Sequence, residues 1–400
     1  MNNQYSTLSL SLTRKLSKDD KKNNGIFFTP LNIIKQAIDE LFKVNLDIKT
    51  ILEPSCGSCE FICHIDKIME KSQIIGVEYH KEIYEGIKDL KVNHNQLSII
   101  NEDYLNYDLL HTHKFDLIIG NPPYYVIKKE KRYAKFYEGR PNIFILFIIH
   151  SLYKLNENGV LLFILPKSFL NCLYYNKLRN HIYNNYKIIS IVDCSSESYI
   201  ETEQDTIIFM IQNKKGDNSE FALRFNDIII FNSKDNINHL KRLYENSSTL
   251  DDLNFEVKVG NLVWNQNKDI LTNDNSKTRL IYSSDIKDGV IIDNTYKNKE
   301  KKCYIDKKGV NGLLLVVNRG YGNGEYKFNY CLIDVAYNYL IENHLIYIKY
   351  KSAIDDEDLR RLYERIIKSF EDLKTKEFIK IYFGNNAINT TELQHLLPIY

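Results

Sequence analysis

Apolar residues recur in short runs over the first half of the chain, and stretches with helical spacing separate these runs. Near-continuous apolar strands that alternate with helices are typical of a mostly parallel sheet with helices on both faces. The pattern therefore predicts an α/β domain with a Rossmann-like, seven-stranded sheet. The predicted strands are Thr50–Glu53, Ile74–Glu78, Leu97–Ile100, Phe115–Gly120, Val160–Leu165, Ile188–Asp193 and Thr206–Gln212.

A helix is predicted ahead of the first strand. Thr29 and Pro30 suit an N-cap and a first-turn proline. Apolar residues then follow at helical spacing, namely Ile33, Ile34, Ala37, Ile38, Leu41 and Phe42. We expect this apolar face to pack on the sheet.

The alternation stops after Asn213, where lysines, asparagines and glycines divide the chain into shorter segments. We place a domain boundary near residues 213–230, and expect a polar arm at 1–24, an α/β domain at 25–220 and an α+β domain at 221–400. The last helix is predicted to begin near Asp355, because acidic residues there complement the helix dipole. Its predicted apolar stripe is Leu359, Leu362, Ile366, Phe370 and Leu373.

The composition is that of a folded globular protein, with 44% hydrophobic residues and a formal net charge of +1 over 400 residues. A near-neutral charge does not favour a nucleic-acid partner, so any such partner has to be argued from local charge. Met1–Asn24 lacks the apolar core of a secretory signal. The longest strongly apolar run, Ile143–Ile149, is far shorter than the roughly 20 residues that span a bilayer. We expect an intracellular, cytoplasmic protein with no membrane partner.

Three cysteines near the first strand have a spacing found in zinc sites. Cys56, Cys59 and Cys63 are followed by His64, but no second C-x-x-C pair exists to complete four ligands. We therefore expect no metal, and interpret these residues as small side chains packed beneath a turn.

The strand ends carry residues that suit a nucleoside. In an open parallel sheet, ligands bind at the carboxyl ends of the strands. The first strand runs into a turn of small residues at Glu53–Phe61, Glu78 ends the second, and Asp103 follows the third. Glu78 is placed to accept hydrogen bonds from two ribose hydroxyls, and Asp103 to hold the exocyclic amine of an adenine. The missing G-x-G-x-x-G and G-x-x-x-x-G-K-[ST] motifs argue against a dinucleotide or a triphosphate.

The fourth predicted strand ends in Asn121, Pro122, Pro123 and Tyr124. Consecutive prolines cannot donate ladder hydrogen bonds, and they hold the backbone extended beyond the sheet. If the Asn121 side-chain oxygen and the Pro122 carbonyl each accept one N–H of a planar amine, the nitrogen lone pair becomes available to attack a sulfonium methyl group. Tyr124 would stack on the face of the substrate.

With these motifs in this order, the chain resembles the gamma-class N6-adenine DNA methyltransferases. The resemblance covers Asn24 to Gln212 with specific motifs and the C-terminal part only loosely. It implies the class I methyltransferase fold, S-adenosylmethionine as cofactor with S-adenosylhomocysteine as product, and a C-terminal target-recognition domain. It also implies a flipped adenine, which Tyr199 would sandwich with Tyr124, and contact of Thr29 with the methionyl carboxylate.

The resemblance assigns catalysis to Asn121, Pro122, Pro123 and Tyr124. The residues that it assigns to the cofactor are Phe28, Thr29, Pro30, Glu53, Pro54, Ser55, Cys56, Gly57, Glu78, Tyr79, Asp103, Tyr104, Asn121 and Pro123. One departure is Cys59, where many relatives carry glycine. If the backbone there requires a positive φ, Cys59 costs on the order of 1 kcal/mol.

A duplex adenine has to be flipped to reach such a pocket, so contacts to the DNA backbone are expected nearby. The loop after the catalytic motif, residues 127–140, has four more basic than acidic residues, with Tyr133, Phe136 and Tyr137 interleaved. Basic and aromatic residues beside the motif suit phosphate contact and closure over a strand. The predicted DNA-binding residues are Lys128, Lys129, Lys131, Arg132, Lys135, Arg140 and, in the second domain, Arg319.

Three functions remain open from the sequence. The first is a site-specific DNA adenine methyltransferase acting on double-stranded DNA. The second is a methyltransferase with the same motif acting on a protein glutamine or an RNA amine, and the third is a non-catalytic nucleic-acid-binding relative. The sequence predicts a monomer or a dimer, and leaves open the recognition site, a cognate restriction endonuclease, and a bacterial or viral source.

Overall fold

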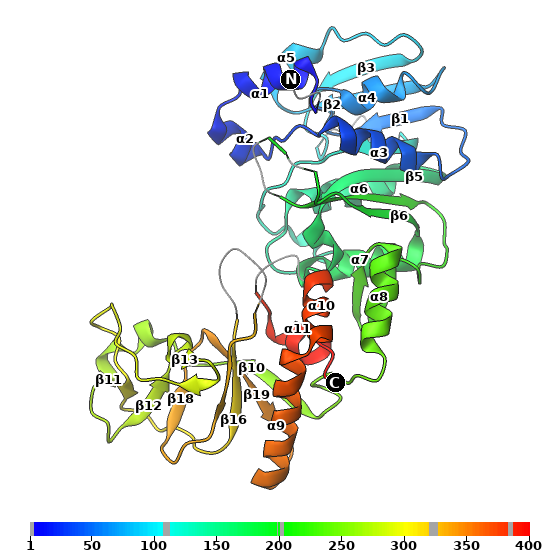
Figure 1. Ribbon diagram of the computed structural model, residues 1–400. Coiled ribbons are helices and arrows are strands. Elements are labelled where there is room, and N and C mark those ends of the chain that lie inside the picture. The colour runs from blue at the N-terminus through cyan, green and yellow to red at the C-terminus, as the bar shows by residue number, and fades with distance from the viewer. Residues whose placement is uncertain (1–3, 107–112, 198, 201–203, 320–326, 383–386) are drawn as a thin grey trace. The chain divides into compact units, whose positions relative to one another are not determined.

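The computed structural model describes residues 4–106, 113–197, 199–200, 204–319, 327–382 and 387–400. Contacts divide the chain into two compact units, Met1–Asn238 and His239–Tyr400, which Figure 1 shows in blue to green and in green to red. Each unit is described separately below.

The first unit is built on one seven-stranded sheet with the order β3-β2-β1-β4-β5-β7-β6. Neighbouring strands are parallel from β3 to β5, and β7 is antiparallel to both β5 and β6. The mostly parallel sheet predicted from the sequence is thus confirmed. The strands are β1 Thr50–Glu53, β2 Gln73–Glu78, β3 Gln96–Asn101, β4 Phe115–Gly120, β5 Leu155–Pro166, β6 Lys187–Asp193 and β7 Thr206–Gln212.

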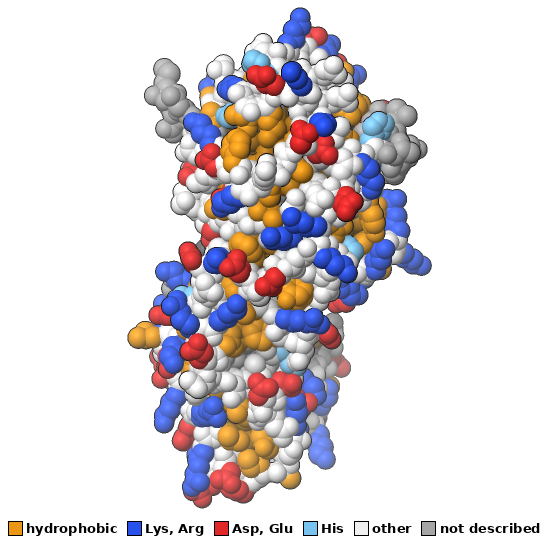
Figure 2. All heavy atoms as spheres, turned by 90° about the vertical axis from the view of Figure 1, so that its right-hand side faces the viewer, with side chains coloured by type: hydrophobic (Ala, Val, Ile, Leu, Met, Phe, Trp, Pro, Cys, Tyr) orange, Lys and Arg blue, Asp and Glu red, His pale blue; other side chains and the backbone are white. Residues whose placement is uncertain are grey.

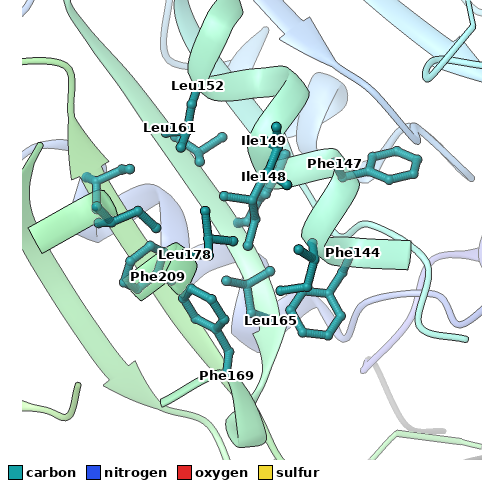
Figure 3. Close-up of a cluster of buried hydrophobic side chains, with 14 of the residues drawn as sticks. Phe144, Phe147, Ile148, Ile149, Leu152, Leu161, Leu165, Phe169, Leu178 and Phe209 are labelled. Carbon is teal, nitrogen blue, oxygen red and sulfur yellow. The ribbon is translucent and has the colours of Figure 1, made fainter. Parts of the chain in front are cut away.

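Helices cover both faces of the sheet. They are α1 Thr7–Lys15, α2 Lys18–Asn24, α3 Leu31–Leu41, α4 Glu60–Ile65, α5 Lys81–Ile87, α6 Ile143–Lys154 and α7 Asn176–Asn185. Successive strand residues point to opposite faces, so Leu161 packs against one helical layer and Leu162 against the other. Helix α6 is apolar on nearly all sides, and Figure 3 shows Phe144, Ile148 and Leu152 on it beside Leu161 and Leu165 of β5.

Helix α3 begins at Leu31, one residue later than predicted. Pro30 is the N-cap, and no side chain caps the helix. The predicted N-cap Thr29 is therefore wrong, and its hydroxyl is engaged elsewhere. The predicted apolar face is confirmed, because Ile33, Ile34 and Ala37 are fully buried against the sheet.

The first unit extends beyond residue 220, where the sequence places the boundary. The hairpin of β8 (Ala222–Phe225) and β9 (Ile228–Phe231) packs Ala222, Ile229 and Phe231 into the same core as α6. The ring of Phe231 stacks on that of Phe209 in β7, with centroids 6.0 Å apart. Residues 1–24, expected as a polar arm, include α1 and α2, and Leu12 and Leu16 are buried among the residues of the sheet and α3.

The second unit contains two four-stranded sheets of order β10-β19-β16-β17 and β11-β15-β12-β18, and a β13-β14 pair. Its strands are β10 Phe255–Val259, β11 Leu271–Thr272, β12 Thr278–Ile281, β13 Ile286–Lys287, β14 Val290–Ile291, β15 Tyr304–Ile305, β16 Leu314–Asn318, β17 Tyr330–Ile333, β18 Tyr339–Ile341 and β19 Leu345–Tyr350. Its helices are α9 Asp356–Glu371, α10 Leu373–Tyr382 and α11 Thr390–His395, and α8 Lys234–Tyr244 spans the division.

The last long helix confirms most of its prediction. Asp355 is the N-cap of α9, and its side chain accepts hydrogen bonds from the backbone N–H groups of Glu357 and Asp358. Ile366 and Phe370 of the predicted stripe are buried. Leu373 was wrongly included, because it begins α10 and is 73% exposed.

Candidate active site

A cavity of about 230 Å³ lies at the carboxyl ends of β1, β2 and β4. Its lining includes ten residues that the sequence assigns to the cofactor, namely Phe28, Pro54, Ser55, Gly57, Glu78, Tyr79, Asp103, Tyr104, Asn121 and Pro123. The other four, Thr29, Pro30, Glu53 and Cys56, lie outside that lining. The sheet thus gathers most of the predicted residues at one place.

Glu78 forms part of the cavity wall at the end of β2. Its Oε2 accepts a hydrogen bond from the Gly57 backbone N–H (2.9 Å), and its Oε1 accepts one from the His80 N–H (2.7 Å). Burial raises the pKa of the carboxyl to about 7, although these backbone donors oppose the shift. The carboxylate is therefore fixed in position, and its remaining lone pairs can accept hydroxyl donors.

Glu53 at the end of β1 is a buried carboxyl with an unsatisfied oxygen. Its side chain is 2% exposed, and Oε2 has no hydrogen-bond partner among the described residues. Burial raises the pKa of this carboxyl well above its usual range. A buried carboxyl oxygen without a partner is costly, which makes Glu53 a candidate for a functional contact.

The turn between β1 and α4 contains the predicted strain. Cys59 adopts a left-handed conformation (φ 59°, ψ 28°) as the N-cap of α4, so the condition under which the sequence analysis expected a cost at Cys59 is met. Cys56 and Cys59 are buried in the core beneath the turn. Throughout the described ranges, no group of three or more His, Cys, Asp and Glu side chains is placed to hold a metal ion.

The Asn121 carboxamide is hydrogen-bonded on both sides. Its Nδ2 donates to Thr29 Oγ1 (3.0 Å) and, more weakly, to the Phe27 carbonyl (3.4 Å). The Tyr124 hydroxyl donates to Asn121 Oδ1 (2.6 Å) and lies 2.8 Å from the carbonyl oxygen of Ile164 in β5. The Tyr124 hydroxyl thus donates to Asn121 Oδ1, the atom that was expected to accept an N–H of the substrate amine.

A second cavity, of about 110 Å³, also contacts the motif. It is lined by Phe27, Tyr124, Tyr199, Gln204 and Thr206. The two predicted stacking tyrosines, Tyr124 and Tyr199, therefore face the same space. Asn121 and Pro123 line the first cavity, Tyr124 lines the second, and Phe27 lines both.

Gly25 explains how the segment Gly25–Pro30 approaches the catalytic motif. It ends α2 in a left-handed conformation with φ 62°. A Cβ at this position would lie 2.7 Å from the Tyr124 backbone nitrogen, closer than side chains tolerate. Only glycine allows this packing, which places Phe27 and Thr29 beside Asn121.

Helix α1 contacts the turn that lines the first cavity. The buried Ser9 Oγ lies 2.9 Å from Ser58 Oγ and donates to Glu60 Oε1 (3.0 Å). At the other side of the site, the Tyr5 hydroxyl accepts a hydrogen bond from the Ile200 N–H (3.2 Å), next to Tyr199. The N-terminal segment therefore links the cofactor turn with one wall of the second cavity.

The loop after the motif, residues 127–140, is packed on the protein. Its six basic residues are exposed, and Arg132 pairs with Glu130 (2.7 Å). Tyr133, Phe136 and Tyr137 are buried in the core, so the expected role of these aromatic residues in closing over a strand is not supported. Figure 2 shows one face of the protein, on which Lys and Arg side chains are interspersed with acidic and apolar ones.

Arg319, the predicted DNA contact of the second unit, follows β16 and is exposed. Its backbone carbonyl accepts a hydrogen bond from the Ile388 N–H (3.0 Å). Most of the glycine- and tyrosine-rich stretch after it, residues 320–326, lies outside the described residues.

Sequence reasoning missed several residues of both cavities. In the first, these include Phe27, His80, Ile83, Leu105 and Phe147. In the second, they are Phe27, Gln204 and Thr206. The position of Phe27 beside the predicted Phe28 was a usable signal, whereas the others depend on how separate elements pack.

Of the helices described, none is long and apolar enough to cross a membrane.

Comparison with known proteins gives consistent results along the chain. Residues 4–200 match the family model described as Eco57I restriction-modification methylase. The chain is 28% identical over 98% of both chains to the Type II methyltransferase M.CvrRI of Paramecium bursaria Chlorella virus XZ-6E. It is 27% identical over 99% of both chains to the modification methylase CviBIII of Paramecium bursaria Chlorella virus NC1A.

Among solved structures, a cryo-EM structure of a DrdV–DNA complex resembles the chain with a TM-score of 0.51 and 12% identity. The likeness covers 94% of this chain and 56% of that one. At this identity the likeness concerns the fold alone. The strand order agrees with the class I methyltransferase fold expected from the sequence, and the match to a methylase family supports S-adenosylmethionine as the cofactor. Residues 4–200 are thus similar to the Eco57I restriction-modification methylases, and the chain is similar along nearly its whole length to methylases of Type II systems.

Proposed function

We propose that the protein transfers a methyl group from S-adenosylmethionine to the N6 amine of an adenine that is flipped out of double-stranded DNA. The observation that carries this proposal is that residues of the motif line two cavities, which also share Phe27. Asn121 and Pro123 line the cavity of about 230 Å³, and Tyr124 lines the cavity of about 110 Å³. A catalytic motif that brings a methyl donor and a planar amine together has to contact the binding cavities of both.

The residues of the first cavity fit the cofactor. Glu78 presents a fixed carboxylate for ribose hydroxyls, and Gly57 leaves room for a ligand beside the backbone. The unpaired oxygen of Glu53 lies behind the same turn and would favour a nearby cation such as the methionyl ammonium. When bound, the cofactor supplies a methyl group on a positively charged sulfur, which departs as a neutral thioether.

The residues of the second cavity fit a planar base. The two tyrosines offer aromatic rings for stacking, and Phe27 adds a third apolar surface. The Asn121 Oδ1 and the Pro122 carbonyl would each accept one N–H of the adenine amine. These preorganised acceptors favour a tetrahedral nitrogen, so its lone pair becomes available for in-line attack.

Several features support double-stranded DNA as the substrate. The relatives that match along nearly the whole chain are named as Type II and modification methylases. Six exposed basic side chains follow the motif, and the 162 residues from His239 to Tyr400 form a second unit suited to target recognition. We propose separately that a cognate restriction endonuclease exists. A nuclease assay on unmethylated host DNA tests for its cleavage activity.

The proposal is tested by incubating the purified protein with unmodified genomic DNA and labelled methyl donor, followed by nucleoside analysis. We expect label in N6-methyladenine, and none when Asn121→Ala replaces the wild-type protein. Parallel reactions contain RNA or a cell protein extract in place of DNA. Label that appears only in RNA or on protein glutamine would contradict the DNA assignment, and turnover retained by Asn121→Ala would contradict the mechanism.

A further inference from the structure

The two ends of the Asn121 carboxamide have different neighbours, which defines its orientation. A backbone carbonyl only accepts hydrogen bonds, so the end that faces the Phe27 carbonyl has to be the NH₂ group. The same NH₂ group donates to Thr29 Oγ1 (3.0 Å). Asn121 Oδ1 consequently points the other way, towards the Tyr124 hydroxyl.

Thr29 has no other role that its surroundings indicate. Its side chain is 7% exposed and lies outside the lining of the first cavity. It does not cap α3, because Pro30 is the N-cap residue and no side chain fills the capping role. The hydroxyl of Thr29 is therefore positioned for Asn121.

We propose that Thr29 is a positioning residue that keeps Asn121 Oδ1 directed at the substrate amine. This inference rests on the proposed function of Asn121. A carboxamide rotated by half a turn would present N–H donors to the N–H donors of the substrate, and the lone pair of the nitrogen would lose its acceptor. Because the Phe27 carbonyl only accepts hydrogen bonds, that rotation sets two acceptor oxygens against each other, while the Thr29 hydroxyl anchors the carboxamide in place.

The Tyr124 hydroxyl complements this arrangement in the resting protein. It has one hydrogen but lies near two acceptors, Asn121 Oδ1 at 2.6 Å and the Ile164 carbonyl at 2.8 Å. When a substrate amine donates to Asn121 Oδ1, the hydroxyl hydrogen turns fully to Ile164, and no polar group loses its partner. Tyr124 thus keeps Asn121 Oδ1 satisfied until the substrate arrives, without having to leave its position.

The test compares Thr29→Val, which keeps the side-chain shape but removes the acceptor, with Thr29→Ser, which keeps the acceptor. We expect Thr29→Val to lower kcat for DNA methylation by about tenfold or more, the effect of losing one orienting hydrogen bond to a catalytic group. The Kd for S-adenosylhomocysteine should stay within about twofold of wild type, since the cavity lining is unchanged. Thr29→Ser should restore most of kcat, and thermal unfolding verifies that both variants are folded.

The alternative role of Thr29, contact with the methionyl carboxylate, gives the opposite result. In that case Thr29→Val weakens S-adenosylhomocysteine binding and raises KM for the methyl donor, while kcat at saturating donor stays near wild type. That outcome overturns the inference, as does a Thr29→Val protein with unchanged kcat. A wild-type protein that methylates no DNA adenine instead overturns the proposed function, and this is established before the variants are compared.

Discussion

Burial of Glu78 links the protonation of one carboxyl to cofactor binding. Its pKa is raised to about 7 because the side chain is removed from water at the end of β2. A folded-state pKa above the unfolded value means that this group's contribution to stability is present below the unfolded pKa and is lost as the pH rises through about 7. A ligand whose hydroxyls donate to the carboxylate favours the deprotonated form.

We therefore expect the affinity for S-adenosylhomocysteine to increase as the pH rises from about 6 to about 8. Calorimetric titration across this range measures the effect. Glu78→Gln should bind about tenfold or more weakly and lose most of this pH dependence, since a hydrogen bond to a charged group contributes roughly 1.5–3 kcal/mol. A residual slope in that variant belongs to Glu53, whose carboxyl pKa is also raised by burial. An unchanged slope in Glu78→Gln would exclude Glu78 from the cofactor contact.

Most of the residues that the sequence assigned to the cofactor line the first cavity, because most of them follow the carboxyl end of a strand. That position follows from the apolar run before it, as with Glu78 after β2 and Asn121 after β4. The hydrogen bonds of Asn121 to Thr29 and Tyr124 were not predictable in this way, because they depend on how Gly25 lets two distant segments approach. Thr29 itself was misread as a cap because Thr-Pro is a common start to a helix.

At the scale of the element, helix α1 supports the cofactor turn from outside the sheet. The buried Ser9 hydroxyl contacts Ser58, which follows Gly57 of the cavity lining, and Glu60 of α4. Sequence patterning did not reveal this helix, because its mixed polar residues resemble a solvated arm. Tertiary contacts of Leu12 and Leu16 stabilise it instead.

Ser9→Ala should lower the free energy of unfolding by about 1 kcal/mol, because it leaves the buried Ser58 hydroxyl and the partly buried Glu60 carboxylate with fewer partners. We also expect weaker binding of S-adenosylhomocysteine, since the turn loses a support. Ser11→Ala is the matched control, as Ser11 lies on the exposed side of the same helix. Chemical denaturation and calorimetry provide the two readouts, and equal effects of both substitutions would refute a specific role of Ser9.

Strand β4 and its diproline end illustrate what local chemistry determines. The apolar run Phe115–Gly120 specifies a buried strand, and the prolines that follow prevent it from continuing. The hairpin β8–β9 instead lies within residues 221–400, which the sequence analysis placed in the second domain, although it packs in the core of the first unit. Its apolar residues look alike in either unit, and only the packing of Phe231 on Phe209 identifies its core.

At the scale of the whole molecule, a net charge of +1 coexists with a local excess of basic residues after the catalytic motif. Lys128 and Lys129 are exposed and follow the motif after three intervening residues. Phosphate contacts release condensed counterions, so they determine how steeply affinity falls with salt. The electrostatic contribution of this loop can therefore be measured without knowing the recognition sequence.

For each of Lys128→Ala and Lys129→Ala, we expect weaker DNA binding at low salt. The slope of log affinity against log salt should decrease in magnitude by about 0.9 per lost phosphate contact. Fluorescence anisotropy on a duplex across a salt series measures this slope. Lys91→Ala, at an exposed lysine between α5 and β3, is the control. Slopes identical to wild type in both loop variants would place the DNA elsewhere.

A crystal structure of the protein with a nonreactive cofactor analogue and a duplex that contains the target adenine, not yet methylated, tests the proposed mechanism most directly. We expect the analogue in the cavity of Glu78 and Asp103, and an extrahelical adenine between Tyr124 and Tyr199. Its N6 atom should lie about 3 Å from Asn121 Oδ1 and from the Pro122 carbonyl. An adenine that remains stacked in the duplex, or an N6 atom remote from both oxygens, would contradict the mechanism.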